Sequence, residues 1–192
     1  MKLKSLKLIV LVSIIIFNSC DNKSQIKRET DFNFDWKFAL QKDTISHHKT
    51  PLNDTEWRNI RLPHDWSVEH SFDSIYEGAT GYLPGGVAYY QKHFKTPINK
   101  DSEKAYILFD GVYNNAKFWL NGKLLGENPY GYSPVYFDIS NALNTDEKDN
   151  VLTVYVDHSR YADSRWYTGS GIYRNVKLIT TNKLHIPVWG TF

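Results

Sequence analysis

Residues 109–138, FDGVYNNAKFWLNGKLLGENPYGYSPVYFD, decide the fold. Side chains at 112–120 alternate between an apolar set and a mixed set, as the two faces of an extended strand do. Asn-Gly at 121–122 then separates two extended runs, and this dipeptide suits a two-residue type I′ turn because both of its residues take positive φ. Further breaks fall at 128–129 and 132–134, where proline interrupts the chain. The stretch predicts three antiparallel strands.

Length and charge restrict the class of protein. The chain has 192 residues, enough for one domain with a sound core plus tails, and its aromatic content of 15% favours large buried side chains. The net charge is +2, but Lys2, Lys4 and Lys7 account for three positive charges, so the remainder carries −1. Lysine and arginine are scattered rather than clustered, and no nucleic-acid partner is expected.

The N-terminus predicts export. Three lysines precede an apolar run at residues 8–17, which is the pattern of a signal peptide and is far shorter than the ~20 residues of a transmembrane helix. Cys20, the sole cysteine, follows this run. The pattern at 1–20 resembles a lipoprotein signal, in which Cys20 becomes the lipidated first residue and anchors the protein to a membrane at the periplasm or cell surface. An ordinary cleaved signal peptide with an incidental cysteine is the alternative.

The rest of the chain predicts an all-β fold. A polar tether is expected at 21–31, and no segment of ten or more residues has helical spacing of its apolar side chains. Short strands separated by turn residues, as in a β-sandwich or jelly roll, are expected at 32–38, 57–62, 87–95, 105–109, 151–156 and 172–180. The histidine pair at 47–48 lies in a polar run that lacks cysteine or clustered carboxylates, so we predict neither a metal site nor a cofactor.

Four motifs stand in order along the chain: LPHDW at 62–66, GYLPGGVAYY at 81–90, FDGVYNNAKFWLNG at 109–122 and SRWYTGSGIYRNV at 164–176. Together they resemble the N-terminal sugar-binding domain of glycoside hydrolase family 2, the β-galactosidase and β-glucuronidase family. The resemblance implies a jelly-roll β-sandwich of the galactose-binding-domain type over residues 32–181. It also implies a role in an exported retaining glycosidase, β-galactosidase-like, that acts on β-linked glycans.

In that family an immunoglobulin-like sandwich and a (β/α)₈ barrel follow this domain, and the barrel carries both reacting glutamates. Residues 182–192 resemble the first strand of the second domain, and a barrel needs ~250 residues. We therefore expect a fragment that is inactive alone and whose partners are the C-terminal domains of the same enzyme. The alternatives are a non-catalytic carbohydrate-binding surface lipoprotein and a structural module.

Sugar sites combine aromatic faces, which cover the C–H side of a pyranose, with planar polar groups that bind its hydroxyls. The loop YADSRWY at 161–167 offers both. The resemblance implies that Asp163 contacts sugar hydroxyls, with Arg165 and Trp166 as flanking substrate-binding residues. The alternative interpretation places Trp166 in the core and pairs Arg165 internally.

His64, Asp65 and Trp66 allow two interpretations. Because Pro63 fixes a turn, these side chains suit either local structure or a site. An independent hydrolase is not predicted, since a retaining glycosidase needs two rigidly held carboxyls about 5 Å apart and no spacing here provides them.

Overall fold

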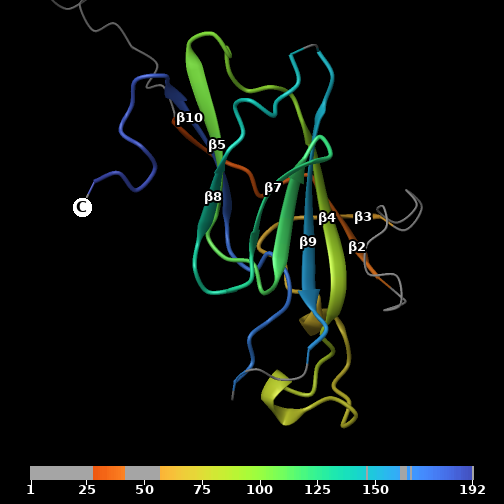
Figure 1. Ribbon diagram of the computed structural model, residues 1–192. Helices are drawn as coiled ribbons and strands as arrows, with labels where there is room; N and C mark the ends of the chain where they lie inside the picture. The colour runs from red at the N-terminus through yellow and green to blue at the C-terminus, as the bar shows by residue number, and fades with distance from the viewer. Residues whose placement is uncertain (1–27, 42–56, 146, 161–163, 165, 192) are drawn as a thin grey trace, which may run out of the picture.

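The computed structural model describes residues 28–41, 57–145, 147–160, 164 and 166–191. They form two antiparallel sheets (Figure 1). The four-stranded sheet contains, in spatial order, β1 (Glu29–Asp31), β10 (Val176–Asn182), β5 (Glu103–Phe109) and β8 (Val135–Asp138). The six-stranded sheet contains β3 (Arg58–Ile60), β2 (Trp36–Leu40), β4 (Gly86–Phe94), β9 (Asn150–His158), β6 (Ala116–Leu120) and β7 (Lys123–Asn128). Two 3-10 turns, η2 (Ser67–Glu69) and η3 (Gly78–Thr80), precede β4. The predicted all-β sandwich is confirmed.

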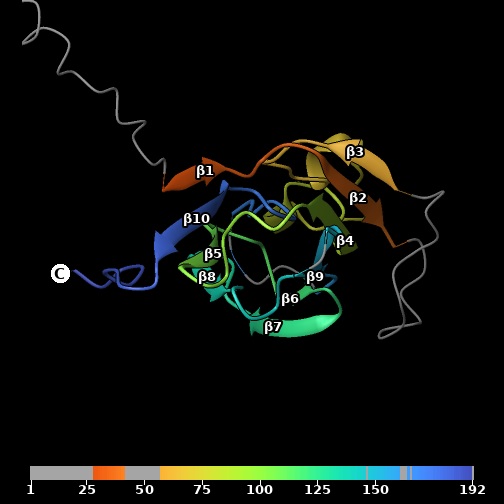
Figure 2. The same ribbon diagram turned by 90° about the horizontal axis from the view of Figure 1, so that it is seen from above.

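The core lies between the two sheets, which face one another when seen from above (Figure 2). Alternate residues of β2 and β4 point inward, so Trp36, Phe38 and Tyr90 are buried. Phe109 of β5 and Phe118 of β6 join the layers, with ring centroids 4.7 Å apart. Aromatic side chains bury the most apolar area per residue, and they offset a total hydrophobic content of only 41%.

The predicted hairpin is confirmed. Leu120 pairs with Lys123, and the turn residues Asn121 and Gly122 have φ of 51° and 80°, as a type I′ turn requires. The strand that precedes it is shorter than predicted. It begins at Ala116, because residues 112–115 leave the sheet and form a connection that includes a cis peptide between positions 113 and 114.

Two predicted strands begin later than the sequence indicated. Phe34 lies in the strand predicted at 32–38, but it is 45% exposed. Asp35 has a φ of 54°, which breaks the extended alternation, so β2 begins only at Trp36. Similarly, β10 begins at Val176 rather than at residue 172, and residues 172–175 belong to an irregular connection.

The ends of the described chain also differ from expectation. Residues 29–31, within the predicted tether, form β1 and pair with β10. Residues 184–191, predicted to begin a further strand, contain none. Val188 instead packs against side chains of β5 and β10 that point away from the main core, Tyr106, Leu108 and Ile179. There the Trp189 ring meets Tyr136 edge-on at 4.8 Å, and His185 lies 3.0 Å from the Tyr106 hydroxyl. Within the described ranges, no helix has the length and apolar character needed to cross a membrane.

Candidate functional site

The candidate site lies at one end of the sandwich. There the start of β4 and the end of β9 are adjacent, because Gly86 pairs with His158. The connection that contains η2 and η3 projects beyond the strands there, at the bottom of Figure 1. A Cβ at Gly85 would lie 2.1 Å from the His158 carbonyl oxygen. Only glycine allows the two backbones to approach this closely.

The LPHDW segment lies along the second half of the SRWYTGSGIYRNV motif. The His64 amide donates to the Ile172 carbonyl at 2.8 Å, and the Trp66 amide donates to that of Ser170 at 3.1 Å. Trp66 is fully buried, and its indole N–H donates to the Gly85 carbonyl at 3.2 Å. Two motifs that are about a hundred residues apart in the sequence are therefore a single packed unit.

Asp65 of the LPHDW motif links it to the SRWYTGSGIYRNV motif through its carboxylate. Its Oδ1 accepts hydrogen bonds from the amides of Ser67, at 3.0 Å, and Ser170, at 2.9 Å. The Tyr167 hydroxyl donates to Oδ2. Burial, and then the adjacent carboxylate, raise the pKa of the Tyr167 phenol, so the phenol keeps its proton and remains the donor. The Asp65 carboxylate is thus held by donors of the protein itself.

His64 is the centre of a second polar network. Its Nδ1 lies 2.8 Å from the buried Tyr90 hydroxyl, and its Nε2 lies 3.1 Å from Glu69 Oε1. Burial lowers the pKa of His64 below its ordinary value of 6.5. Burial opposes ionisation of Glu69 as well, but hydrogen bonds from Arg58 and His64 outweigh it and lower the pKa of Glu69. Glu69 is therefore an ionised partner in an ion pair with Arg58.

Trp166 is the predicted sugar-binding residue that the structure describes, and it lies on the surface. Its side chain is 63% exposed, and its indole N–H donates to the Tyr132 hydroxyl at 3.1 Å. Tyr132 in turn contacts the exposed ring of Tyr130, with centroids 5.5 Å apart. We call Tyr130, Tyr132 and Trp166 the aromatic platform. The interpretation of Trp166 as a core residue is wrong.

Asp163 and Arg165, the other two predicted sugar-binding residues, lie outside the described residues, as do Cys20 and the histidine pair at 47–48. Sequence reasoning missed Tyr130 and Tyr132 because they come from the loop before β8, far from the 161–167 loop along the chain. The available signal was PYGYSP at 129–134, in which two tyrosines lie between prolines.

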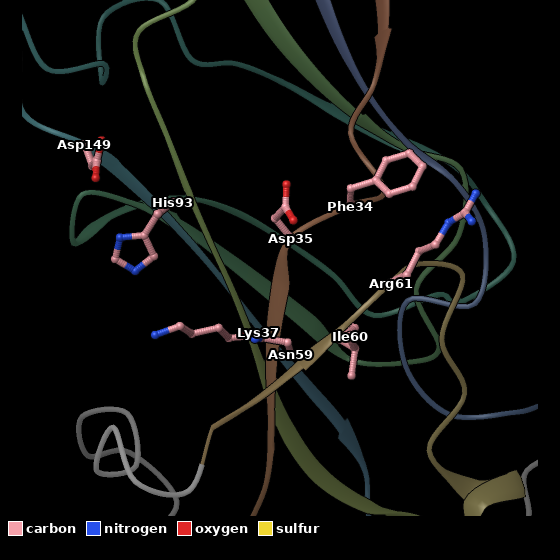
Figure 3. A pocket seen from close by; sticks show the side chains of 8 residues that line it. All are labelled: Phe34, Asp35, Lys37, Asn59, Ile60, Arg61, His93 and Asp149. Carbon is pink, nitrogen blue, oxygen red and sulfur yellow. The ribbon is translucent and has the colours of Figure 1, made fainter.

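A hollow lies on the outer face of the six-stranded sheet (Figure 3). It is lined by side chains of β2, β3 and β4 and of the connections next to them: Phe34, Asp35, Lys37, Asn59, Ile60, Arg61, His93 and Asp149. Its aromatic ring, Phe34, has the Arg61 guanidinium over one face at 4.3 Å from the centroid. His93 and Asp149 lie at the side of the hollow away from that ring (Figure 3). With its ring face covered and its polar groups apart, this hollow suits a sugar less well than the aromatic platform does.

Metal binding needs several clustered ligands. In the ranges that the structure describes, no three side chains of His, Cys, Asp or Glu come together in a way that could hold an ion.

The family described as "Glycosyl hydrolases family 2, sugar binding domain" matches residues 30–182. The chain belongs to this family. A β-galactosidase of Bacteroides ovatus, BoGH2A, is 41% identical over 179 residues, which cover 91% of this chain and 21% of that enzyme. A putative β-glucuronidase of Formosa agariphila is 39% identical over 93% of this chain and 17% of its own length.

The comparison with solved structures agrees with the family match. A β-glycosidase from Bacteroides vulgatus superposes with a TM-score of 0.73 at 40% identity, over 83% of this chain and 21% of that one. A family 2 glycosyl hydrolase from Bacteroides cellulosilyticus gives 0.76 at 37% identity, over 86% of this chain and 22% of that one. The 192 residues thus span about a fifth of the length of these relatives.

Proposed function

We propose that this chain is the N-terminal sugar-binding domain of an exported retaining glycosidase that hydrolyses β-linked glycans and is β-galactosidase-like. The family match over residues 30–182 carries the proposal. The names of the relatives support it, since they include a β-galactosidase and a putative β-glucuronidase. In such an enzyme other domains of the same polypeptide provide the two carboxyls of a retaining mechanism, and this domain provides contacts to the sugar.

The aromatic platform, with Asp163 and Arg165 in the adjoining loop, forms the proposed contact surface. An exposed indole beside tyrosine hydroxyls offers both an apolar face for a pyranose and hydrogen-bonding groups for its hydroxyls. Trp166 meets this requirement, because its ring is largely exposed while its N–H bond to Tyr132 orients it.

Export and lipid attachment at Cys20 are part of the proposal. The basic start, the short apolar run at 8–17 and the sole cysteine directly after it support them. The enzyme would then be anchored to a membrane at the periplasm or cell surface, where it meets glycans from outside the cell.

Hydrolysis of nitrophenyl β-galactoside and β-glucuronide by the full-length gene product tests the function. Asp163→Ala should lower kcat/KM roughly ten- to a hundredfold, the effect of losing a hydrogen bond to a charged group worth ~1.5–3 kcal/mol. Trp166→Ala should lower kcat/KM as well, because the apolar face for the pyranose is lost. Both should change Tm little. Trp189→Ala is the matched control, because Trp189 is also half-exposed but lies against Tyr136 on another surface. The 192-residue chain should show no turnover.

Three results would contradict the proposal. Turnover by the 192-residue chain that Asp163→Ala abolishes would place the reacting group in this domain. A full-length product that binds β-glycosides without cleaving either substrate would favour the non-catalytic carbohydrate-binding lipoprotein. Equal losses for Trp166→Ala and Trp189→Ala would remove the aromatic platform from the site.

A further inference from the structure

The loop proposed to contact sugar is held at its C-terminal end by hydrogen bonds of Ser170. Ser170 is fully buried, and its hydroxyl lies 2.6 Å from that of Ser67 and 2.7 Å from Nδ1 of His158. Its amide and carbonyl are bonded to Asp65 and Trp66, as described above. Tyr167, three residues earlier, is bonded through its phenol to the same Asp65 carboxylate. The loop segment 167–170 thus meets one carboxylate at both of its ends.

Between these two contacts the chain passes very close to Asp65. Gly169 has a φ of 77°, and a Cβ at this position would lie 2.8 Å from Asp65 Oδ2. A side chain would therefore push the carboxylate away from Tyr167, and the backbone conformation itself favours glycine. Tyr167 is enclosed on another side by Gly81, where a Cβ would lie 3.4 Å from the tyrosine ring.

We propose that Asp65 is a positioning residue for the sugar-facing loop: it fixes segment 167–170 and thereby orients Trp166, without touching sugar itself. The claim about sugar rests on the proposed function, whereas the claim about the loop rests on the contacts alone. A loop that is held in its binding geometry before the ligand arrives loses less conformational entropy on binding.

The contacts argue against a direct sugar-binding role for Asp65. Its two oxygens already accept three hydrogen bonds from the protein, two of them from backbone amides. Carboxylates that accept backbone N–H bonds form charge-assisted hydrogen bonds, which are the stronger kind. A sugar hydroxyl would have to displace one of these donors, and because its bond to the carboxylate would be of the same charge-assisted kind, the exchange would bring no gain and would leave a protein donor unpaired.

Amide hydrogen exchange in the 192-residue chain tests the proposal. Asp65→Ala should speed exchange at the amides of Ser67 and Ser170 roughly ten- to a hundredfold, the factor expected for a hydrogen bond to a charged group. Amides in β4 and β9 should keep their protection. Asp65→Asn should largely restore the protection of Ser170, because the amide oxygen still accepts. Tyr167→Phe should loosen residues 166–169 without opening the strands.

Asp73→Ala is the matched control. Asp73 makes the same kind of local turn, accepting the Ile75 amide at 3.0 Å, but it makes no bond to the 167–170 segment among the contacts described. It should leave Ser170 unchanged. Unchanged exchange at Ser170 in Asp65→Ala, or an equal loss of protection across the whole sandwich, would overturn the proposal. If Asp65→Ala does not fold, failure of Tyr167→Phe to loosen residues 166–169 would overturn it instead.

Binding of methyl β-galactoside to the unmodified chain, followed by NMR, separates this proposal from the proposed function. In one outcome the unmodified chain binds no glycoside while Asp65→Ala still speeds exchange at the Ser170 amide. This result supports the positioning role of Asp65 and contradicts the proposed sugar contact. A chain that binds glycoside while Ser170 exchanges identically in both proteins preserves the sugar role and refutes the positioning role.

Discussion

Gly171→Ala is expected to be among the most damaging single-methyl additions in this domain. Gly171 has a φ of 118°, and a Cβ there would lie 2.2 Å from the Tyr90 hydroxyl and 2.9 Å from the His64 carbonyl oxygen. Tyr90 is fully buried and bonded to His64, so neither neighbour can move without breaking the network that supports the LPHDW segment.

The magnitude follows from two costs. A non-glycine residue in this backbone region costs about 1–3 kcal/mol, and an added methyl in a packed interior costs about 1–3 kcal/mol more. The expected loss is therefore about 2–6 kcal/mol, a large part of the ~5–15 kcal/mol that stabilises a typical domain. Gly122→Ala separates the two costs, because Gly122 also has a positive φ, 80°, but nothing lies within 4 Å of its Cβ position.

Gly122→Ala should accordingly cost about 1–3 kcal/mol, the backbone strain alone. The gain from restricting the unfolded chain is the same for both substitutions, so it cancels in the comparison. Urea unfolding followed by tryptophan fluorescence measures both losses by linear extrapolation. Equal losses for the two variants would refute the close approach of residue 171 to Tyr90 and His64.

Two further predictions concern titration and export. Because burial lowers the pKa of His64, the unfolded chain binds a proton first as the pH falls below about 6.5, so the free energy of unfolding should decrease from there down to the lowered pKa. His64→Gln should remove this part of the decline in urea unfolding at stepped pH, and an unchanged slope would show that another group titrates. Cells fed a fatty-acid analogue should label the protein at Cys20, and label that persists in Cys20→Ser would exclude that site.

Local patterns in the sequence predicted most of the fold. The type I′ hairpin at 121–122 follows from the φ requirements of two adjacent residues, and the buried faces of β4 and β9 follow from alternation. The prediction failed where one residue departs from extended backbone. Asp35, with its φ of 54°, turns Phe34 out of the core, and aspartate at one position carries no sequence signal strong enough to show this.

The candidate site was less predictable, because its contacts join distant parts of the chain. The loop at 161–167 could be found from its composition, but its neighbours Tyr130 and Tyr132 come from the connection between β7 and β8. The partners of Asp65 are 102 and 105 residues away along the chain. Sheet pairing brings the start of β4 beside the end of β9, and the connections that carry Asp65 and Tyr167 meet there.

This arrangement gives the LPHDW motif a physical meaning that differs from either interpretation of the sequence alone. Asp65 and His64 do not merely satisfy the backbone of their own turn, since their side chains reach Tyr167, Ser170 and Tyr90. Nor are they free to bind a ligand, since those contacts already engage both side chains. The motif holds the loop through hydrogen bonds. Gly169 and Gly171 are the loop positions that come closest to Asp65 and His64. The loop thus takes its order from this segment together with the bond between Ser170 and His158 of β9.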